Sequence, residues 1–160
     1  MAESRRSLPR IYLDTSVIGG YYNSSVAEES RRLIASIRDG KFVMLLSDLV
    51  LAELANAPQE VQDVLLTIPT QQIEYVPLTV EILMLRDAYI AAGVVREKSL
   101  NDAGHVAAAT VSRVSAIVSW NFTHIVRLGK IRGYNQVNLA NGYGILTIMS
   151  PQGVRYDEEN

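Results

Sequence analysis

Residues 10–14 read Arg-Ile-Tyr-Leu-Asp, a short apolar run that ends in a carboxylate. Near-continuous apolar runs of this length are typical of strands that are covered on both faces in a parallel sheet. Four more runs of the same kind lie further along the chain, at residues 42–46, 73–76, 116–119 and 145–149. The sequence therefore predicts a mainly parallel central sheet of about five strands.

Helical patterns fill the intervals between these runs. Gly40 follows the pattern at residues 26–38 and Gly93 follows the one at 79–92, as is typical of helix carboxyl ends. Three further helices are expected: one capped by Ser47 that runs from residue 48 to 56, one from Pro58 to Leu66, and one capped by Asn101 that runs from Asp102 to Val111. Strands that alternate with helices predict an α/β fold with three layers, an α/β/α sandwich.

The length and composition are those of one ordinary globular domain, which we expect to span residues 1–160. With 48% hydrophobic and 20% charged residues, the chain can bury a core without covalent staples. It contains no cysteine, which excludes disulfides and thiolate metal sites and favours a cytoplasmic setting. No apolar run reaches about 18 residues, so we expect no membrane segment. The net charge of −2 gives no general affinity for nucleic acid, which would need a local basic patch.

Three acidic residues lie where the expected elements meet. Asp14 ends the first strand, Glu53 lies in a largely apolar helix after the second, and Asp102 begins the helix DAGHVAAAT. Each has an ordinary explanation: a turn or cap for Asp14, a solvent-facing position for Glu53, and the helix dipole for Asp102. Small residues indicate that the helix after Asp102 packs close to the sheet: Ala103, Gly104, Ala107, Ala108 and Ala109.

The joint placement of these acids predicts a metal site. The carboxyl ends of parallel strands meet at one edge of a sheet, so we expect the three acids and Asn121 to face the same crevice. Two carboxylates at ~4 Å repel each other by about 1 kcal/mol in water, and by about 4 kcal/mol at an effective dielectric constant near 20. A cation would relieve this repulsion. Oxygen ligands without thiolates suit Mg²⁺ or Mn²⁺.

Three stretches together resemble the PIN domain family: IYLDTSVIGG at residues 11–20, LSDLVLAELANAP at 46–58 and NDAGHVAAATVSRVSAIVSWNFTHIV at 101–126. The likeness extends from Ile11 to Val154 in the expected order and spacing. PIN domains are the fold of many metal-dependent ribonucleases, including the VapC-type toxins of prokaryotic toxin–antitoxin pairs. The resemblance implies a PIN-like fold in which Asp14, Glu53 and Asp102 are the catalytic, metal-binding acids.

The resemblance also implies hydrolysis of RNA phosphodiester bonds. Asp14 and Asp102 are expected to hold one Mg²⁺ or Mn²⁺ ion, while Glu53 orients or deprotonates the attacking water. Thr15 and Ser16 would add hydroxyl hydrogen bonds. Many family members carry a fourth acid where this chain has Asn121, an amide that brings no charge, so the case for a second tightly held ion is weaker.

Several residues around these motifs are candidates for RNA binding or support. The possible contacts to the RNA backbone, for which solvated helix ends are an equal explanation, are Arg96, Lys98, Arg127, Lys130 and Arg132. Tyr134 and Tyr143 are candidates for base stacking, with ordinary packing as the alternative. His105 either reaches the rim of the site or is a hydrogen-bonded structural residue, and His124 is expected to shape the loop that carries Asn121.

Two other functions stay open beside the ribonuclease. With Asn121 neutral, the site is also compatible with a weak or inactive PIN-like module that binds RNA or protein. A hydrolase of small phosphoesters is the third possibility, since a fold alone does not set function. By the resemblance we expect a homodimer and an antitoxin protein as partners. The helix at Pro58–Leu66 offers apolar side chains either to such a dimer or to internal packing.

Overall fold

The computed structural model describes residues 7–156, and its centre is an all-parallel sheet of five strands in the order β3-β2-β1-β4-β5. The strands are β1 (Arg10–Leu13), β2 (Val43–Ser47), β3 (Ile73–Val76), β4 (Ala116–Val118) and β5 (Ile148–Met149). Tyr12 of β1 is paired with Leu45 of β2 on one side and with Ile117 of β4 on the other. The strand order reverses at β1, which is where parallel α/β sheets leave a crevice at their carboxyl edge.

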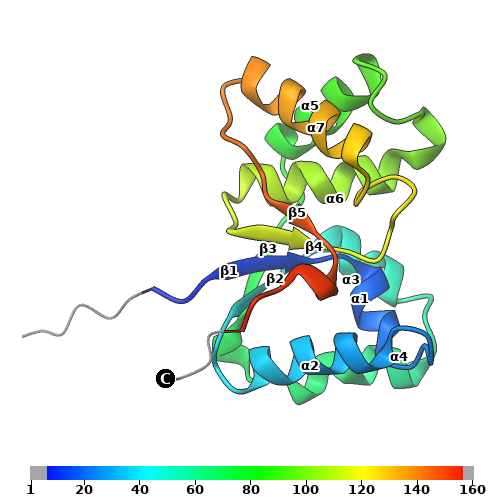
Figure 1. Cartoon of the computed structure of the whole chain (residues 1–160), viewed down its shortest axis with the longest axis vertical. Helices are drawn as coiled ribbons and strands as arrows, with labels where there is room; N and C mark the ends of the chain where they lie inside the picture. Colours follow the sequence, from blue (N-terminus) through cyan, green and yellow to red (C-terminus); the bar gives the residue numbers. More distant parts are fainter. Residues whose placement is uncertain (1–6, 157–160) are drawn as a thin grey trace, which may run out of the picture.

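Helices cover both faces of this sheet and confirm the predicted α/β/α sandwich (Figure 1). On one face lie α1 (Thr15–Gly20), α2 (Ala27–Arg38) and α4 (Gln59–Val64). On the other, α6 (Leu100–Val111) lies nearest the sheet, with α5 (Val80–Ala91) and α7 (Leu128–Ala140) beyond it. Helix α3 (Asp48–Leu54) follows β2 at the carboxyl edge. Four short 3₁₀ turns complete the described chain: Leu65–Thr67, Thr70–Gln72, Glu97–Ser99 and Pro151–Gly153.

Most of the predicted helix ends are confirmed. The Ser47 hydroxyl accepts a hydrogen bond from the backbone N–H of Val50 at 3.2 Å, and Thr79 caps α5 in the same way. Gly40 and Gly93 adopt φ of +83° and +73°, a backbone region that residues with a Cβ rarely occupy. None of the helices within residues 7–156 is long and apolar enough to span a membrane.

Several predicted ends were wrong. Helix α3 ends at Leu54 rather than at residue 56, and α4 ends at Val64 rather than at Leu66, where a 3₁₀ turn takes over. Helix α6 begins at Leu100 rather than after Asn101, so Asp102 lies inside its first turn. The 3₁₀ turn Glu97–Ser99 leads directly into α6 and moves its start back by two residues. The last strand is also shorter than residues 145–149, because only Ile148 and Met149 pair with β4.

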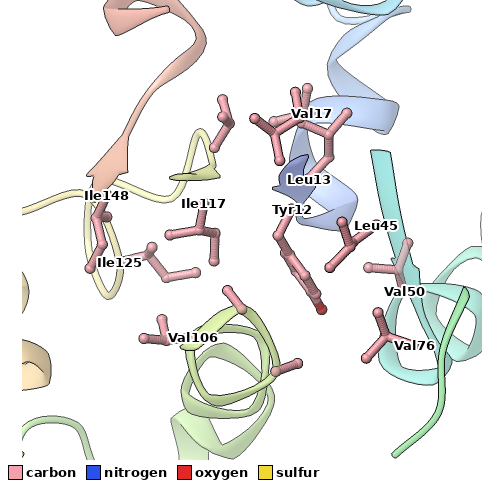
Figure 2. Packing of buried hydrophobic residues seen from close by; sticks show 14 of the residues in the cluster. Tyr12, Leu13, Val17, Leu45, Val50, Val76, Val106, Ile117, Ile125 and Ile148 are labelled. Atoms are coloured by element: carbon pink, nitrogen blue, oxygen red, sulfur yellow. The ribbon is translucent and has the colours of Figure 1, made fainter. Parts of the chain in front are cut away.

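The core is built by alternation along β1. Successive strand residues point to opposite faces, so Tyr12 points toward α6 while Leu13 packs near Val17 of α1 (Figure 2). The predicted close packing of α6 is confirmed, since every residue from Ala103 to Thr110 is buried. The fit around Gly104 is tight, because a Cβ there would lie 2.9 Å from Leu49 Cδ1 of α3. A larger side chain at position 104 would therefore have to displace the side chain of Leu49.

Replacing Gly104 by Val is expected to lower the free energy of unfolding by about 1–3 kcal/mol, because the added methyl groups overpack the contact with Leu49. Denaturation by urea measures this change. Gly129→Val in α7 is the matched control, since nothing lies within 4 Å of a Cβ at that position. Equal effects of the two substitutions would show that α6 is not tightly packed.

Candidate functional site

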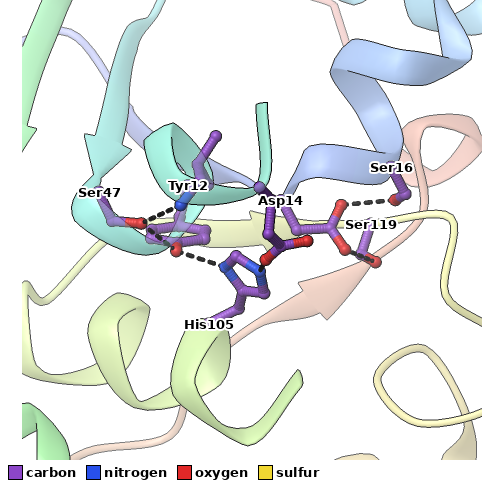
Figure 3. Close-up of polar contacts among 8 residues, drawn as sticks. Tyr12, Asp14, Ser16, Ser47, His105 and Ser119 are labelled. Carbon is purple, nitrogen blue, oxygen red and sulfur yellow. Dashed lines mark hydrogen bonds and ion pairs between the residues drawn. The ribbon is translucent and has the colours of Figure 1, made fainter. Parts of the chain in front are cut away.

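The carboxylate of Asp14 lies buried at the carboxyl end of β1, with 4% of the residue exposed. By strand alternation it points to the same face as Tyr12, toward α6. Oδ1 accepts a hydrogen bond from Ser16 Oγ at 2.5 Å, and Oδ2 accepts one from Ser119 Oγ at 2.6 Å (Figure 3). Asp14 precedes α1, but its side chain makes no capping hydrogen bond to that helix. The turn or cap explanation therefore does not account for its carboxylate.

The backbone N–H groups that bond to Ser16 and Ser119 orient both hydroxyls so that they donate to Asp14. Ser16 Oγ accepts the backbone N–H of Trp120 at 2.9 Å, and Ser119 Oγ accepts that of Asn121 at 2.9 Å. Each hydroxyl is thus a donor to Asp14 and an acceptor from the chain after β4. Burial raises the pKa of Asp14, and the hydrogen bonds from Ser119 and Ser16 oppose this rise. The serine hydrogen bonds thus favour the charged carboxylate against the larger, opposite effect of burial.

Glu53 reaches the site from α3, with 35% of its side chain exposed. Its carboxylate forms an ion-pair contact and hydrogen bond with Nε2 of His105. Desolvation acts to raise the pKa of Glu53, but the hydrogen bond from His105, the charge that His105 carries when protonated and the hydrogen bond with Thr15 together leave the pKa lowered. Glu53 is therefore not a solvated surface residue, and its charged form is favoured at neutral pH.

His105 is buried on α6 and joins Glu53 to the interior of the sheet. Its Nδ1 lies 2.7 Å from the Tyr12 hydroxyl, which lies 2.6 Å from Ser47 Oγ (Figure 3). One assignment of protons satisfies the whole chain: Ser47 donates to Tyr12, Tyr12 donates to Nδ1, and Nε2–H donates to Glu53. Burial raises the pKa of Tyr12, so this hydroxyl keeps its proton. Both expectations for His105 are thereby met, because it is hydrogen-bonded and it faces the site.

Asp102 is half-buried in the first turn of α6. Desolvation raises its pKa, while His124, His105 and a hydrogen bond from Asn121 act to lower it. The charge of Glu53 raises the pKa of both Asp102 and Asp14. The three acids therefore sense a common electrostatic environment, and His105 acts on each of them.

The Asn121 carbonyl oxygen is occupied by its own loop. Oδ1 accepts the backbone N–H groups of Thr123 at 3.2 Å and His124 at 2.9 Å. An amide oxygen has two lone pairs, so both are in use. Toward the site, Asn121 acts to lower the pKa of Asp102 and so favours the charged form of that acid.

The oxygen atoms of the carboxylate and hydroxyl side chains at this site are of the kind that binds a divalent ion. Within residues 7–156, no three His, Asp or Glu side chains gather closely enough to hold an ion as they stand. Mg²⁺, however, is usually bound through one or two carboxylates and several waters. Thr15 Oγ1 is buried near Glu53 and lacks a hydrogen-bond partner of ordinary geometry among the described residues, so it can bond to such a water.

The candidate RNA contacts fall into two groups. Arg127 and Lys130 line a hollow of about 520 Å³ beside α7, together with Val94, Gly129 and Gly133 among others. Lys130 donates to the carbonyl oxygen of Val94 at 2.7 Å, so it also ties α7 to the end of α5. The other candidates, Arg96, Lys98 and Arg132, are exposed and do not line this hollow.

The stacking role considered for Tyr134 was wrong, since Tyr134 is fully buried and donates to the carbonyl oxygen of His124. Tyr143 donates instead to Glu81 of α5. Sequence reasoning missed Tyr12, Ser47 and Ser119 as parts of the site. Their signal was present but weak: each is a hydroxyl inside or directly after an apolar run.

The comparisons with known proteins identify the family and the fold. The sequence matches the PIN domain family over residues 11–122, which spans all three acidic positions and Asn121. A comparison with curated proteins found no match. Among solved structures, the fold is similar to a chain of VapBC2 from Rickettsia felis, determined bound to a DNA fragment from its promoter, with a TM-score of 0.57 and 12% sequence identity. The similarity covers 88% of this chain and 98% of that one. The chain therefore belongs to the PIN domain family.

Proposed function

We propose that this protein is a metal-dependent endoribonuclease. The observation that carries the proposal is the buried carboxylate of Asp14, which is kept ready for a cation by two serine hydroxyls at the end of the central strand. Membership of a family of nucleases supports hydrolysis of a phosphodiester bond. By the resemblance of their motifs to those of the family, Asp14, Glu53 and Asp102 are the acids that we propose for this site.

Each residue has a distinct task in this proposal. Asp14 and Asp102 would hold one Mg²⁺ or Mn²⁺ ion, which supplies charge neutralisation and a lowered pKa for bound water. Glu53 would orient the attacking water and accept its proton. Nε2–H of His105 holds one oxygen of Glu53, and Thr15 lies close to the same carboxylate. Ser16 and Ser119 fix Asp14, and Thr15 Oγ1 is available to a water at the strand end.

We further propose that the protein acts as the toxin of a toxin–antitoxin pair, with an antitoxin protein as partner. This extends the fold similarity to VapBC2 from Rickettsia felis and is a proposal for this chain. A homodimer is also proposed, although the helix at 58–66 supports it less than expected. Val61 and Val64 are buried inside the molecule, and Leu66 is 83% exposed.

A second function, binding of RNA or protein without cleavage, is favoured by one observation. Asn121 stands at the position where many relatives carry an acid, and its carbonyl oxygen is already used by the loop. A weakly held ion would then leave a binding surface without catalysis. Cleavage assays with Mg²⁺ and Mn²⁺ at increasing concentration separate the two functions.

Asp14→Asn is expected to abolish cleavage of single-stranded RNA, because the site loses the carboxylate that holds the ion. Gel analysis of a labelled RNA with Mn²⁺ measures this loss, and Asp39→Asn, an exposed residue after α2, is the matched control. Full activity of the Asp14 variant in a clean preparation would remove Asp14 from the mechanism.

Without metal, the same Asp14→Asn variant is expected to be more stable than the wild type at pH 7. Burial raises the pKa of Asp14, so its ionisation opposes folding above the folded pKa, and this cost disappears below the unfolded value of about 3.9. Melting curves in EDTA between pH 4 and 7 should therefore converge at low pH. Mn²⁺ at about 100 times its Kd should stabilise only the wild type, by about 2.7 kcal/mol. Stabilisation of both proteins would place the ion elsewhere.

Tyr12→Phe is expected to lower kcat by about tenfold with little change in Mn²⁺ affinity, because His105 Nδ1 loses the donor that fixes its tautomer. The substitution keeps the aromatic ring in the core. Single-turnover cleavage and Mn²⁺ calorimetry on the same sample separate the two effects. An unchanged kcat, with the fold intact, would show that the hydroxyl chain does not position Glu53.

A further inference from the structure

A group of aromatic residues lies beside the acidic site and has no part in the mechanism above. It consists of Tyr21, Tyr22, Trp120 and Phe122, with Arg31 packed against it; we call it the aromatic platform. Helix α1 begins after Asp14 and ends at Gly20, so the two tyrosines follow at its far end. The other two rings flank Asn121 in the loop after β4. Trp120 and Phe122 thus adjoin Asn121 at the site, whereas Tyr21 and Tyr22 are separated from Asp14 by the length of α1.

Trp120 joins these two halves. Its backbone N–H donates to Ser16, which binds Asp14, and its indole Nε1 donates to Ser30 Oγ of α2 at 2.8 Å. The ring lies close against the end of α1, since a Cβ at Gly20 would be 3.1 Å from Nε1. The Phe122 ring centroid is 6.2 Å from that of Trp120, in an edge-to-face arrangement. The platform is therefore held by the same hydrogen bonds that fix the catalytic strand ends.

Two rings of this platform remain open to solvent. Phe122 is 51% exposed and Tyr22 is 46% exposed, which is unusual for large aromatic groups with no covering segment. Arg31 lies 4.9 Å from the centroid of the Tyr21 ring and 5.9 Å from that of Tyr22. It donates to the carbonyl oxygen of Tyr21 at 2.8 Å and forms no salt bridge within residues 7–156. A planar cation with unused donors thus accompanies exposed aromatic faces.

We infer that the aromatic platform binds unpaired nucleobases of a single strand whose backbone passes the acidic site. The inference rests on the proposed function and assigns residues that would hold the bases of its substrate: Phe122, Tyr22 and Arg31. Every base has a flat face, so stacking on Phe122 and Tyr22 accepts any sequence. Arg31 supplies the positive charge that a phosphate next to a stacked base requires. A duplex cannot use the platform, because its bases are already stacked on one another.

The chain provides its own reporter for this binding. Trp120 is the only tryptophan, and it lies against Phe122, so a base stacked on the platform should quench its fluorescence. The titration uses an oligouridine of about 12 nucleotides in EDTA, where no cleavage is expected. Fluorescence anisotropy of a labelled copy gives the affinity of the same strand. The matching duplex serves as the second ligand.

Phe122→Ala and Tyr22→Ala are each expected to weaken single-strand binding about tenfold, and Phe122→Trp should restore it. Leu139→Ala, at an equally exposed apolar position of α7, should leave affinity unchanged. Duplex binding should be weak and the same in all variants. Equal single-strand affinity in wild type and both alanine variants would overturn the inference. So would loss of binding to a protein partner, with RNA binding unchanged.

The cleavage assay keeps this inference separate from the proposed function. Platform-dependent binding without cleavage under any divalent ion would support the platform and reject the nuclease. Cleavage that is unaffected by Phe122→Ala and Tyr22→Ala, together with unchanged binding, would support the nuclease and reject the platform.

Discussion

The hydrogen bonds from Ser16 and Ser119 to the buried carboxylate of Asp14 are the interaction on which the site depends. Burial favours the neutral form of this acid, and a neutral acid is a poor ligand for a hard cation. The two hydroxyls come from opposite sides, one from α1 and one from the end of β4. They also accept hydrogen bonds from the backbone N–H groups of Trp120 and Asn121. One set of hydrogen bonds therefore fixes the ends of β1 and β4 and the loop that follows β4.

The second constraint is the polar chain that crosses the core from Ser47 to Glu53. A buried tyrosine and histidine need partners for every polar atom, and here each atom finds one. The chain makes the position of Glu53 depend on the packing of α6 against β1. Small residues in α6 permit this approach, as the tight contact of Gly104 with Leu49 illustrates. The catalytic geometry proposed for Glu53 is thus a consequence of how the core is packed.

The sequence predicted the elements whose residues follow simple periodic patterns. β3 was predicted with its observed bounds, and both glycine stops were placed correctly. Helix α7 was missed because its inward face carries the amides Asn135 and Asn138 in place of aliphatic residues. The side chain of Asn135 forms hydrogen bonds with the backbone N–H and carbonyl groups of Leu146. The hydrophobic pattern of the sequence does not reveal such a partner. The contact between Tyr12 and His105 joins residues 93 positions apart, so no local pattern could assign it.

The neutral Asn121 and the aromatic platform bear on the same electrostatic problem. An RNA substrate would bring a row of negative phosphates to a site for which we propose three carboxylates, and the net charge of the chain offers no general attraction. An amide at position 121 carries no charge, so it adds no repulsion toward the phosphates. It also acts to lower the pKa of Asp102, which favours the charged form of that acid. It weakens the hold on a second ion for the same reason. Stacking on neutral rings, with Arg31 beside them, would then supply affinity that charge alone does not, without crowding the metal.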